Sequence, residues 1–192
     1  MADLRTHHLI YGTMADYLTG DSIVDTDDER YRQKIARFMV QEKGYAREEL
    51  IPRLRLETLF NKNFVTSTVD LTVCLLNRYF MVVRYGPGSL VSRERPAIAA
   101  ARVLNPDYQI PYAVVTNGED AEFLAVDSSK VLACGMEKIP GREQALELLK
   151  TAVFPPPPTA KRREQELRIL NVFDQEICCT GGPCAIPNAP EG

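Results

Sequence analysis

Two adjacent strand-like segments constrain the fold of this chain most. In the first, from about Val65 to Leu76, apolar residues alternate with polar ones, among them Asp70, as in a strand with two different faces. After a two-residue turn at Asn77-Arg78, the residues from Tyr79 to Val83 form an unbroken apolar run. Such a run is typical of a strand that is covered on both sides, so we expect the second segment to be central in a sheet.

Helical patterns flank these strands in the sequence. Thr26 and Glu29 have the spacing of a capping box, and apolar residues then recur at helical intervals, which predicts a helix over 27–43. Ser92 is positioned to cap a second helix that ends near Leu104. We expect a third helix over 142–151 and further strands from Ile51 and at 112–116, 122–126 and 131–134. This order predicts a mixed α/β fold, in which a helix, three antiparallel strands and a crossover helix lead to a parallel strand.

Composition sets limits on function. A chain of 192 residues with 45% hydrophobic residues can bury one principal core. The net charge of -3 gives no global attraction for polyanions, so a nucleic-acid site would have to be a local patch. No stretch has the length and apolarity of an export signal or a membrane span, so we expect a cytoplasmic protein without a membrane partner. Cys74 and Cys134 lie in apolar segments and are expected to be core thiols.

The run from Thr26 to Lys150 resembles the N-terminal nuclease domain of type I restriction enzyme R subunits, a branch of the PD-(D/E)xK superfamily. Four stretches carry the resemblance, in the order that the family has them: 28–34 with 42–45, then Val69-Asp70-Leu71, then Tyr85-Gly86-Pro87-Gly88, and then 114–118. The resemblance implies a restriction-endonuclease-like core and, in active members, hydrolysis of a phosphodiester with Mg²⁺ held by carboxylates.

The resemblance makes Asp70 the first metal-binding acid and Glu29 the supporting glutamate on the first helix. The second acid and the lysine are missing, because their positions fall on Val83 and Tyr85 or, with one residue inserted, on Val82 and Arg84. A site left with Asp70 would hold Mg²⁺ poorly, since one firm carboxylate rarely displaces its waters. An arginine could hold a phosphate but could not transfer a proton as lysine can. The stretch Ala97–Ala101 also lacks the glutamine that the family often places there. We therefore expect remnant catalytic residues and no cleavage.

The domain organisation follows from one stiff proline segment, Pro155–Pro158. We divide the chain into five parts. They are an N-terminal arm with a short helical turn (1–20), a restriction-endonuclease-like domain (21–152), a proline spacer (153–159), a C-terminal helix (160–176) and an irregular tail (177–192). Lys161-Arg162-Arg163 opens the last helix, where positive charge opposes the helix dipole. We interpret it as a solvated face balanced by Glu164 and Glu166, although its placement is also typical of a bound partner.

An arginine-rich and glycine-rich edge lies where the family has its active site. Between Arg78 and Arg102 there are five arginines and one glutamate, together with glycines that allow close backbone approach. If this edge contacts phosphates, the contacts are Arg84, Ser89, Ser92, Arg93 and Arg95. The alternative is a turn and a solvated helix start, with Arg93 and Arg95 paired to nearby acids.

Three cysteines in the tail, Cys178, Cys179 and Cys184, lie within seven residues. A zinc or iron–sulfur site normally has four ligands, and the fourth would have to come from His7, His8 or a second chain. We interpret the cysteines as reactive thiols of an irregular tail rather than as a metal site.

Three hypotheses follow from the sequence. The first is a nuclease-fold protein that has lost cleavage and binds DNA, a protein partner or a second copy through the arginine-rich edge. The second is an active Mg²⁺-dependent endonuclease in which a relocated residue, Glu57, Glu94, Arg93 or Arg95, restores the site. The third is a scaffold or metal-binding protein that works through the proline spacer, the last helix and the cysteine tail.

Overall fold

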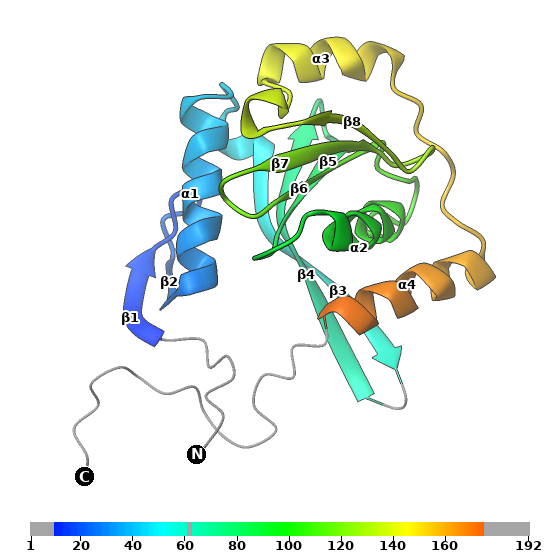
Figure 1. Ribbon diagram of the computed structural model, residues 1–192, viewed down its shortest axis with the longest axis horizontal. Coiled ribbons are helices and arrows are strands. Elements are labelled where there is room, and N and C mark those ends of the chain that lie inside the picture. Colours follow the sequence, from blue (N-terminus) through cyan, green and yellow to red (C-terminus); the bar gives the residue numbers. More distant parts are fainter. Residues whose placement is uncertain (1–9, 61–62, 175–192) are drawn as a thin grey trace.

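The computed structural model describes residues 10–60 and 63–174. Within these residues, a two-stranded sheet precedes a six-stranded mixed sheet in the order β3-β4-β5-β6-β7-β8 (Figure 1). The strands are β1 (Ile10–Ala15), β2 (Ser22–Thr26), β3 (Leu50–Phe60), β4 (Asn63–Leu75), β5 (Arg78–Tyr85), β6 (Tyr112–Thr116), β7 (Ala121–Ala125) and β8 (Lys130–Cys134). The helices are α1 (Asp27–Gln41), α2 (Val91–Val103), α3 (Arg142–Thr151) and α4 (Ala160–Asp174), with short 3₁₀ turns at Arg47–Glu49 and Met136–Lys138.

The connections of the sheet agree with the expected order. β3, β4 and β5 are antiparallel neighbours, and α2 then crosses over to β6, which pairs with β5 in parallel. β7 and β8 complete the sheet with antiparallel pairs. The mixed α/β fold is therefore confirmed, and its architecture is consistent with a restriction-endonuclease-like fold.

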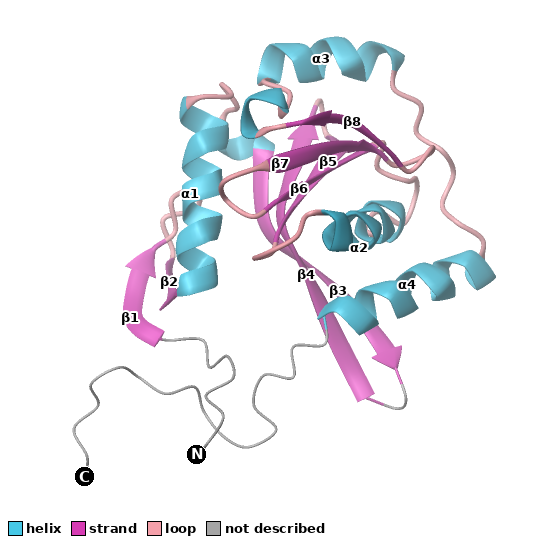
Figure 2. Cartoon of the chain, in the orientation of Figure 1, coloured by secondary structure: helices cyan, strands magenta, loops and turns pink. Residues whose placement is uncertain are grey.

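Helices cover the sheet on both faces (Figure 2). One core packs side chains of α1 and α3 against β4, β5 and β6, and a second core packs the alanines of α2 and Leu170 of α4 against the opposite face. β5 lies between them, and its residues Phe80, Met81, Val82 and Val83 are completely buried. Burial of a side chain of this size contributes about 1.5–3 kcal/mol, so β5 is the strand on which both cores depend.

Several local predictions are corrected by the structure. The two-residue turn before β5 is formed by Leu76 and Asn77, because Arg78 already pairs with Leu75; the predicted turn is one residue off. Both turn residues have positive φ, of 49° and 60°, which matches the twist of a tight hairpin. The N-cap of α2 is Leu90, and the Ser92 hydroxyl instead donates to the Ser89 carbonyl.

The predicted cap of α1 is half confirmed. Thr26 is the N-cap, and its hydroxyl accepts a hydrogen bond from the Glu29 amide, as expected. The Glu29 carboxylate does not complete a capping box, because it accepts hydrogen bonds from Arg32, Gln33 and Arg53. This difference matters because Glu29 belongs to a larger polar network.

Residues 10–26 form a hairpin where the sequence suggested an arm with a helical turn. β1 and β2 pair with each other and not with the main sheet. The hairpin packs on α1, where the Tyr11 hydroxyl donates to Asp27 at 3.1 Å and the Arg30 guanidinium lies 3.9 Å from the centre of the Tyr11 ring. The hairpin thus brings a second segment to the helix that carries Glu29.

The proline segment lies along the protein rather than apart from it. The carbonyls of Pro155 and Pro156 accept hydrogen bonds from the backbone and side-chain amides of Gln109, at 2.8 Å each. Arg78 lies 3.6 Å from the centre of the Phe154 ring. The segment leads into α4, which packs against α2.

His7, His8 and the three tail cysteines lie outside the described residues, so their interpretation as reactive thiols and the alternative of a metal site both stay predictions. Within the described residues, none of the helices has the length and apolarity of a membrane span.

Candidate functional site

Asp70 lies at the point where β4 and β5 separate. The last pair of the β4–β5 ladder is Leu71 with Val83, so Asp70 is one residue beyond it. The Asp70 carboxylate fills the gap, and its Oδ2 accepts a hydrogen bond of 2.8 Å from the Tyr85 backbone amide. The residue is only 5% exposed. The side chain therefore provides the hydrogen bond that a neighbouring strand would otherwise provide.

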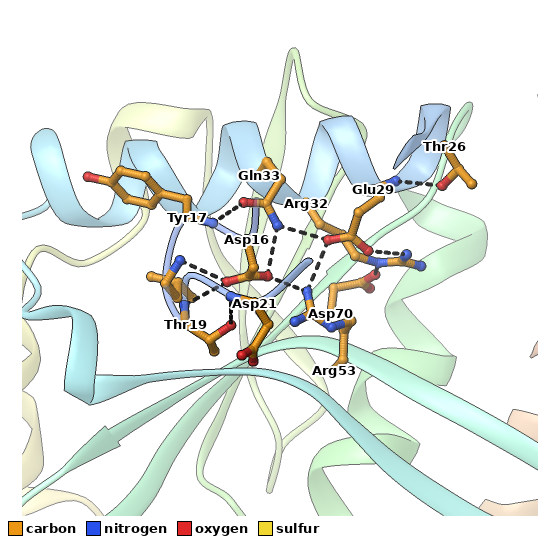
Figure 3. A network of polar contacts seen from close by, with 11 residues as sticks. Asp16, Tyr17, Thr19, Asp21, Thr26, Glu29, Arg32, Gln33, Arg53 and Asp70 are labelled. Carbon is orange, nitrogen blue, oxygen red and sulfur yellow. Dashed lines mark hydrogen bonds and ion pairs between the residues drawn. The ribbon is translucent and has the colours of Figure 1, made fainter. Parts of the chain in front are cut away.

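Arg32 of α1 holds the other oxygen of this carboxylate. Its Nε donates to Asp70 Oδ1 at 2.5 Å, and its Nη1 lies 3.2 Å from Glu29 Oε2 (Figure 3). Burial lowers the pKa of Arg32, but Asp70 and Glu29 outweigh burial and raise it above the ordinary arginine value. The structure thus brings Asp70 and Glu29 together, as expected, with a guanidinium between them.

The network continues from Glu29 to the β1–β2 hairpin. Arg53 Nη1 lies between Glu29 Oε1 at 3.0 Å and Asp16 Oδ2 at 2.6 Å. The Gln33 amide nitrogen donates to the same two carboxylates at 2.9 and 3.0 Å (Figure 3). Burial raises the pKa of Asp16, but hydrogen bonds from Thr19, Arg53, Gln33 and Leu18 outweigh it and lower the pKa to about 2.

Arg53 reaches this network through an unusual backbone conformation. It lies level with Asp70, because its neighbours Pro52 and Leu54 pair with Leu71 and Val69. Its φ of 54° is in the left-handed region, which costs about 1–2 kcal/mol for a residue with a Cβ. Two ion pairs compensate for this strain, and strained residues of this kind concentrate at functional sites.

The network sets limits on the chemistry of the site. Three buried carboxylates, those of Asp16, Glu29 and Asp70, face two guanidiniums from Arg32 and Arg53. Within residues 10–60 and 63–174, no group of three histidine, cysteine or acidic side chains is arranged to hold a metal ion. The residues at Asp70 therefore do not fit the Mg²⁺ that the family resemblance implies, because arginines neutralise the acids that would bind it.

The two candidate positions of the lysine hold side chains of other kinds. Tyr85 stacks on Tyr31 of α1, with ring centroids 4.7 Å apart. Burial, together with Tyr31, Asp28 and Asp70, raises the pKa of Tyr85 to about 12. Arg84 lies on the opposite side of β5, in one row with Val115 of β6 and Glu122 of β7. A neutral tyrosine and a charged arginine are both poor proton-transfer groups at neutral pH.

The predicted phosphate contacts divide into two groups. Ser89 in the loop before α2 and Ser92 in the first turn of α2 are exposed, and the Arg93 guanidinium lies against Gly86, where a Cβ would be 2.9 Å from it. Arg95 instead faces α4, and its Nη2 lies 2.6 Å from Glu166 Oε2. Arg95 thus follows the alternative in which it pairs with an acid, and Arg93 stays at the edge.

Two relocation candidates are acids, and they lie in different parts of the fold from one another. Glu57 is four residues from Arg53 along β3, which is roughly 13 Å for an extended strand. Glu94 shares a hydrogen bond with Glu122, and burial together with Glu94 and Asp120 raises the pKa of Glu122. Glu122 lies two strands from β5, or roughly 10 Å. At its separation along the sheet, Glu57 is too far from Asp70 for one metal ion to bind both carboxylates.

Sequence reasoning missed Asp16, Arg32, Gln33 and Arg53. Part of the signal was present, because Glu29, Arg32 and Gln33 have the i, i+3, i+4 spacing of one helix face. The contributions of Asp16 and Arg53 depend on the hairpin fold and on a left-handed residue, and neither leaves a periodic pattern.

Comparison with known proteins gave one match. The family model described as the type I restriction enzyme R protein N terminus matches residues 27–140. The match begins at the first residue of α1 and ends before α3, so it includes Glu29 and Asp70 but neither the β1–β2 hairpin nor α4. Searches of curated proteins and of solved structures returned no match.

Proposed function

Because this chain belongs to the family of type I restriction enzyme R protein N-terminal domains, we propose that it is a nuclease-fold protein that does not cleave and that binds nucleic acid at the edge before α2. The family match over 27–140 covers more than half of the 192 residues. Loss of cleavage and binding of nucleic acid are both proposals, and each has its own structural support.

The observation that carries the proposal is the occupation of both Asp70 oxygens. Arg32 takes Oδ1 and the Tyr85 amide takes Oδ2. A metal ion bound to Asp70 would lie beside the Arg32 guanidinium, whose positive charge opposes a cation at this carboxylate. The second acid position offers no help, because Val83 is completely buried in the core.

Nucleic-acid binding is supported by the loop that leads into α2. Gly88 has a φ of 87°, and the Gly88 carbonyl accepts a hydrogen bond of 3.3 Å from the Asn117 side chain, which ties this loop to the turn between β6 and β7. Ser89, Ser92 and Arg93 lie along the loop and the first turn of the helix, where hydroxyls and a guanidinium can donate to phosphate oxygens. We keep these three residues and Arg84 as the proposed contacts.

The test is a paired cleavage and binding assay on plasmid and single-stranded DNA with Mg²⁺ or Mn²⁺. The wild type, Asp70→Ala and Arg93→Ala are compared. We expect no cleavage by any of them, salt-sensitive binding by the wild type, and weaker binding by Arg93→Ala.

Two results would count against the proposal. Cleavage by the wild type that disappears in Asp70→Ala would establish the relocated active site instead. Binding that does not change with salt concentration would remove the phosphate contacts.

A further inference from the structure

A second basic surface lies between α2 and α4 and shares only Arg95 with the edge predicted from sequence. We define the α2–α4 basic surface by four residues, Arg95, Arg102, Lys161 and Arg162. The two helices together carry seven lysines and arginines against four acidic residues, whereas the whole chain has a net charge of -3. Positive charge is therefore concentrated here in a chain that is acidic overall.

The centre of this surface is one buried carboxylate with three arginines. Glu166 is completely buried, and its Oε1 lies 2.9 Å from Arg102 Nη1 and 2.8 Å from Arg162 Nε. Arg95 Nη2 lies 2.6 Å from its Oε2. One negative charge thus faces three positive charges, and the Arg95 and Arg162 side chains are 37% and 50% exposed. The exposed positive charge is therefore that of Arg95 and Arg162, whereas Arg102 is 11% exposed and its Nη2 donates to the Val126 carbonyl and the Ser129 hydroxyl.

The first turn of α4 adds charge that the helix itself does not favour. Lys161, Arg162 and Arg163 lie at the positive end of the helix dipole, where each positive charge costs a few tenths of a kcal/mol. From the sequence we expected Glu164 and Glu166 to balance them, and Glu166 does pair with Arg162. In the structure Glu164 pairs with Arg168 at 2.6 Å, and no ion pair of Lys161 is present within the described part of the chain. Charged residues that destabilise their own helix are typical of a binding surface.

We propose that the α2–α4 basic surface binds the phosphates of a nucleic-acid backbone. Guanidiniums match phosphate oxygens in pairs, and the partly exposed guanidiniums are those of Arg95 and Arg162 beside Glu166, with Lys161 next to Arg162 in the chain. Arg95 is two residues from Arg93, so the surface continues the proposed edge along the helix. The inference rests on the proposed function only in taking nucleic acid as the ligand, and it is independent of whether the protein cleaves.

The test uses the full chain and fluorescently labelled single-stranded and duplex oligonucleotides, with binding measured over a range of salt concentrations. The variants are Lys161→Glu, Arg162→Gln and, as a matched control, Arg168→Gln, which removes another arginine of α4 that is paired at i, i+4. Each lost phosphate contact should weaken binding about eightfold at roughly 0.1 M salt and lower the salt slope by about 0.7–0.9. Arg168→Gln should bind as the wild type does.

The outcomes separate this inference from the proposed function. Wild-type affinity in Lys161→Glu and Arg162→Gln, or an equal loss in Arg168→Gln, would overturn the inference. So would binding to vesicles of anionic lipid without binding to either oligonucleotide. Because Lys161 has no ion pair in the described structure, Lys161→Glu tests the surface even if Arg162→Gln disturbs α4. Loss of binding in Arg93→Ala alone would support the edge and exclude the α2–α4 basic surface. Cleavage by the wild type would overturn the proposed function but would leave this inference intact.

Discussion

Replacing Arg32 by methionine should destabilise the protein by about 3 kcal/mol, because it leaves the buried Asp70 carboxylate with only one hydrogen-bond donor. Removal of one partner of a fully buried ion pair costs about 3–5 kcal/mol. The Arg32 side chain is 23% exposed and that of Asp70 is 6% exposed, so we place the cost at the lower end of this range. Methionine keeps most of the apolar stem, so the loss measures the charge interaction rather than packing.

Urea unfolding followed by circular dichroism measures this effect. With a slope of about 2 kcal/mol/M, a loss of 3 kcal/mol lowers the midpoint by roughly 1.5 M. A double-mutant cycle with Asp70→Asn isolates the pair, and the double variant should be more stable than the sum of the two single losses predicts. Arg168→Met is the control, because its ion pair with Glu164 is exposed on both sides and contributes little. If Arg32→Met and Arg168→Met have the same midpoint, the account of the network is refuted.

Three further predictions test other parts of the structure. Asp16 has a folded-state pKa of about 2, whereas the unfolded pKa is near 4. Its contacts therefore stabilise the protein fully above about pH 4, and this stabilisation is lost as the pH falls toward 2. Acid titration should destabilise the wild type more than Asp16→Asn. Gly118→Ala should lower the melting temperature, since Gly118 has a φ of 90° and a Cβ there would be 3.2 Å from the Tyr31 ring. Gly88→Ala is the control, because Gly88 has a φ of 87° but open space around it, so its melting temperature should fall only by the effect of backbone strain. Val83→Glu should not restore cleavage and should unfold the protein, which circular dichroism would show, because an unpaired carboxylate at a completely buried position is not tolerated.

The fold could be predicted from sequence where one period or one cap determines an element. The alternation in β4, the apolar run of β5 and the Thr26 cap are local signals, and they placed the central strands and α1 correctly. The sequence misplaces the turn before β5 by one residue because leucine is not a typical turn residue, and Leu76 is nevertheless 78% exposed there. A tight hairpin accepts it because the pairing of Leu75 with Arg78 fixes the backbone.

The candidate site was predictable only in part, for a different reason. Asp70 and Glu29 could be found because a family motif marks them, but the contacts that decide their chemistry come from Arg32 and Arg53. These contacts depend on how the hairpin, helix and strands assemble. Asp16 and Arg53 are 37 positions apart in the sequence, and Arg32 and Asp70 are 38 positions apart. In the same way, the sequence shows Glu166 as a surface acid of an amphipathic helix, and only the packing of α4 on α2 buries it.

The hydrogen bond between the Asp70 carboxylate and the Tyr85 amide gives this aspartate a structural role that is separate from catalysis. Wherever two strands part, the amides beyond the last pair lose their acceptors, and a short acidic side chain on one strand can replace the missing carbonyl. An aspartate at this place therefore has a role in the sheet that does not depend on metal binding. The aspartate alone therefore does not identify a nuclease. The groups around it, here Arg32 and the Tyr85 amide, decide its chemistry.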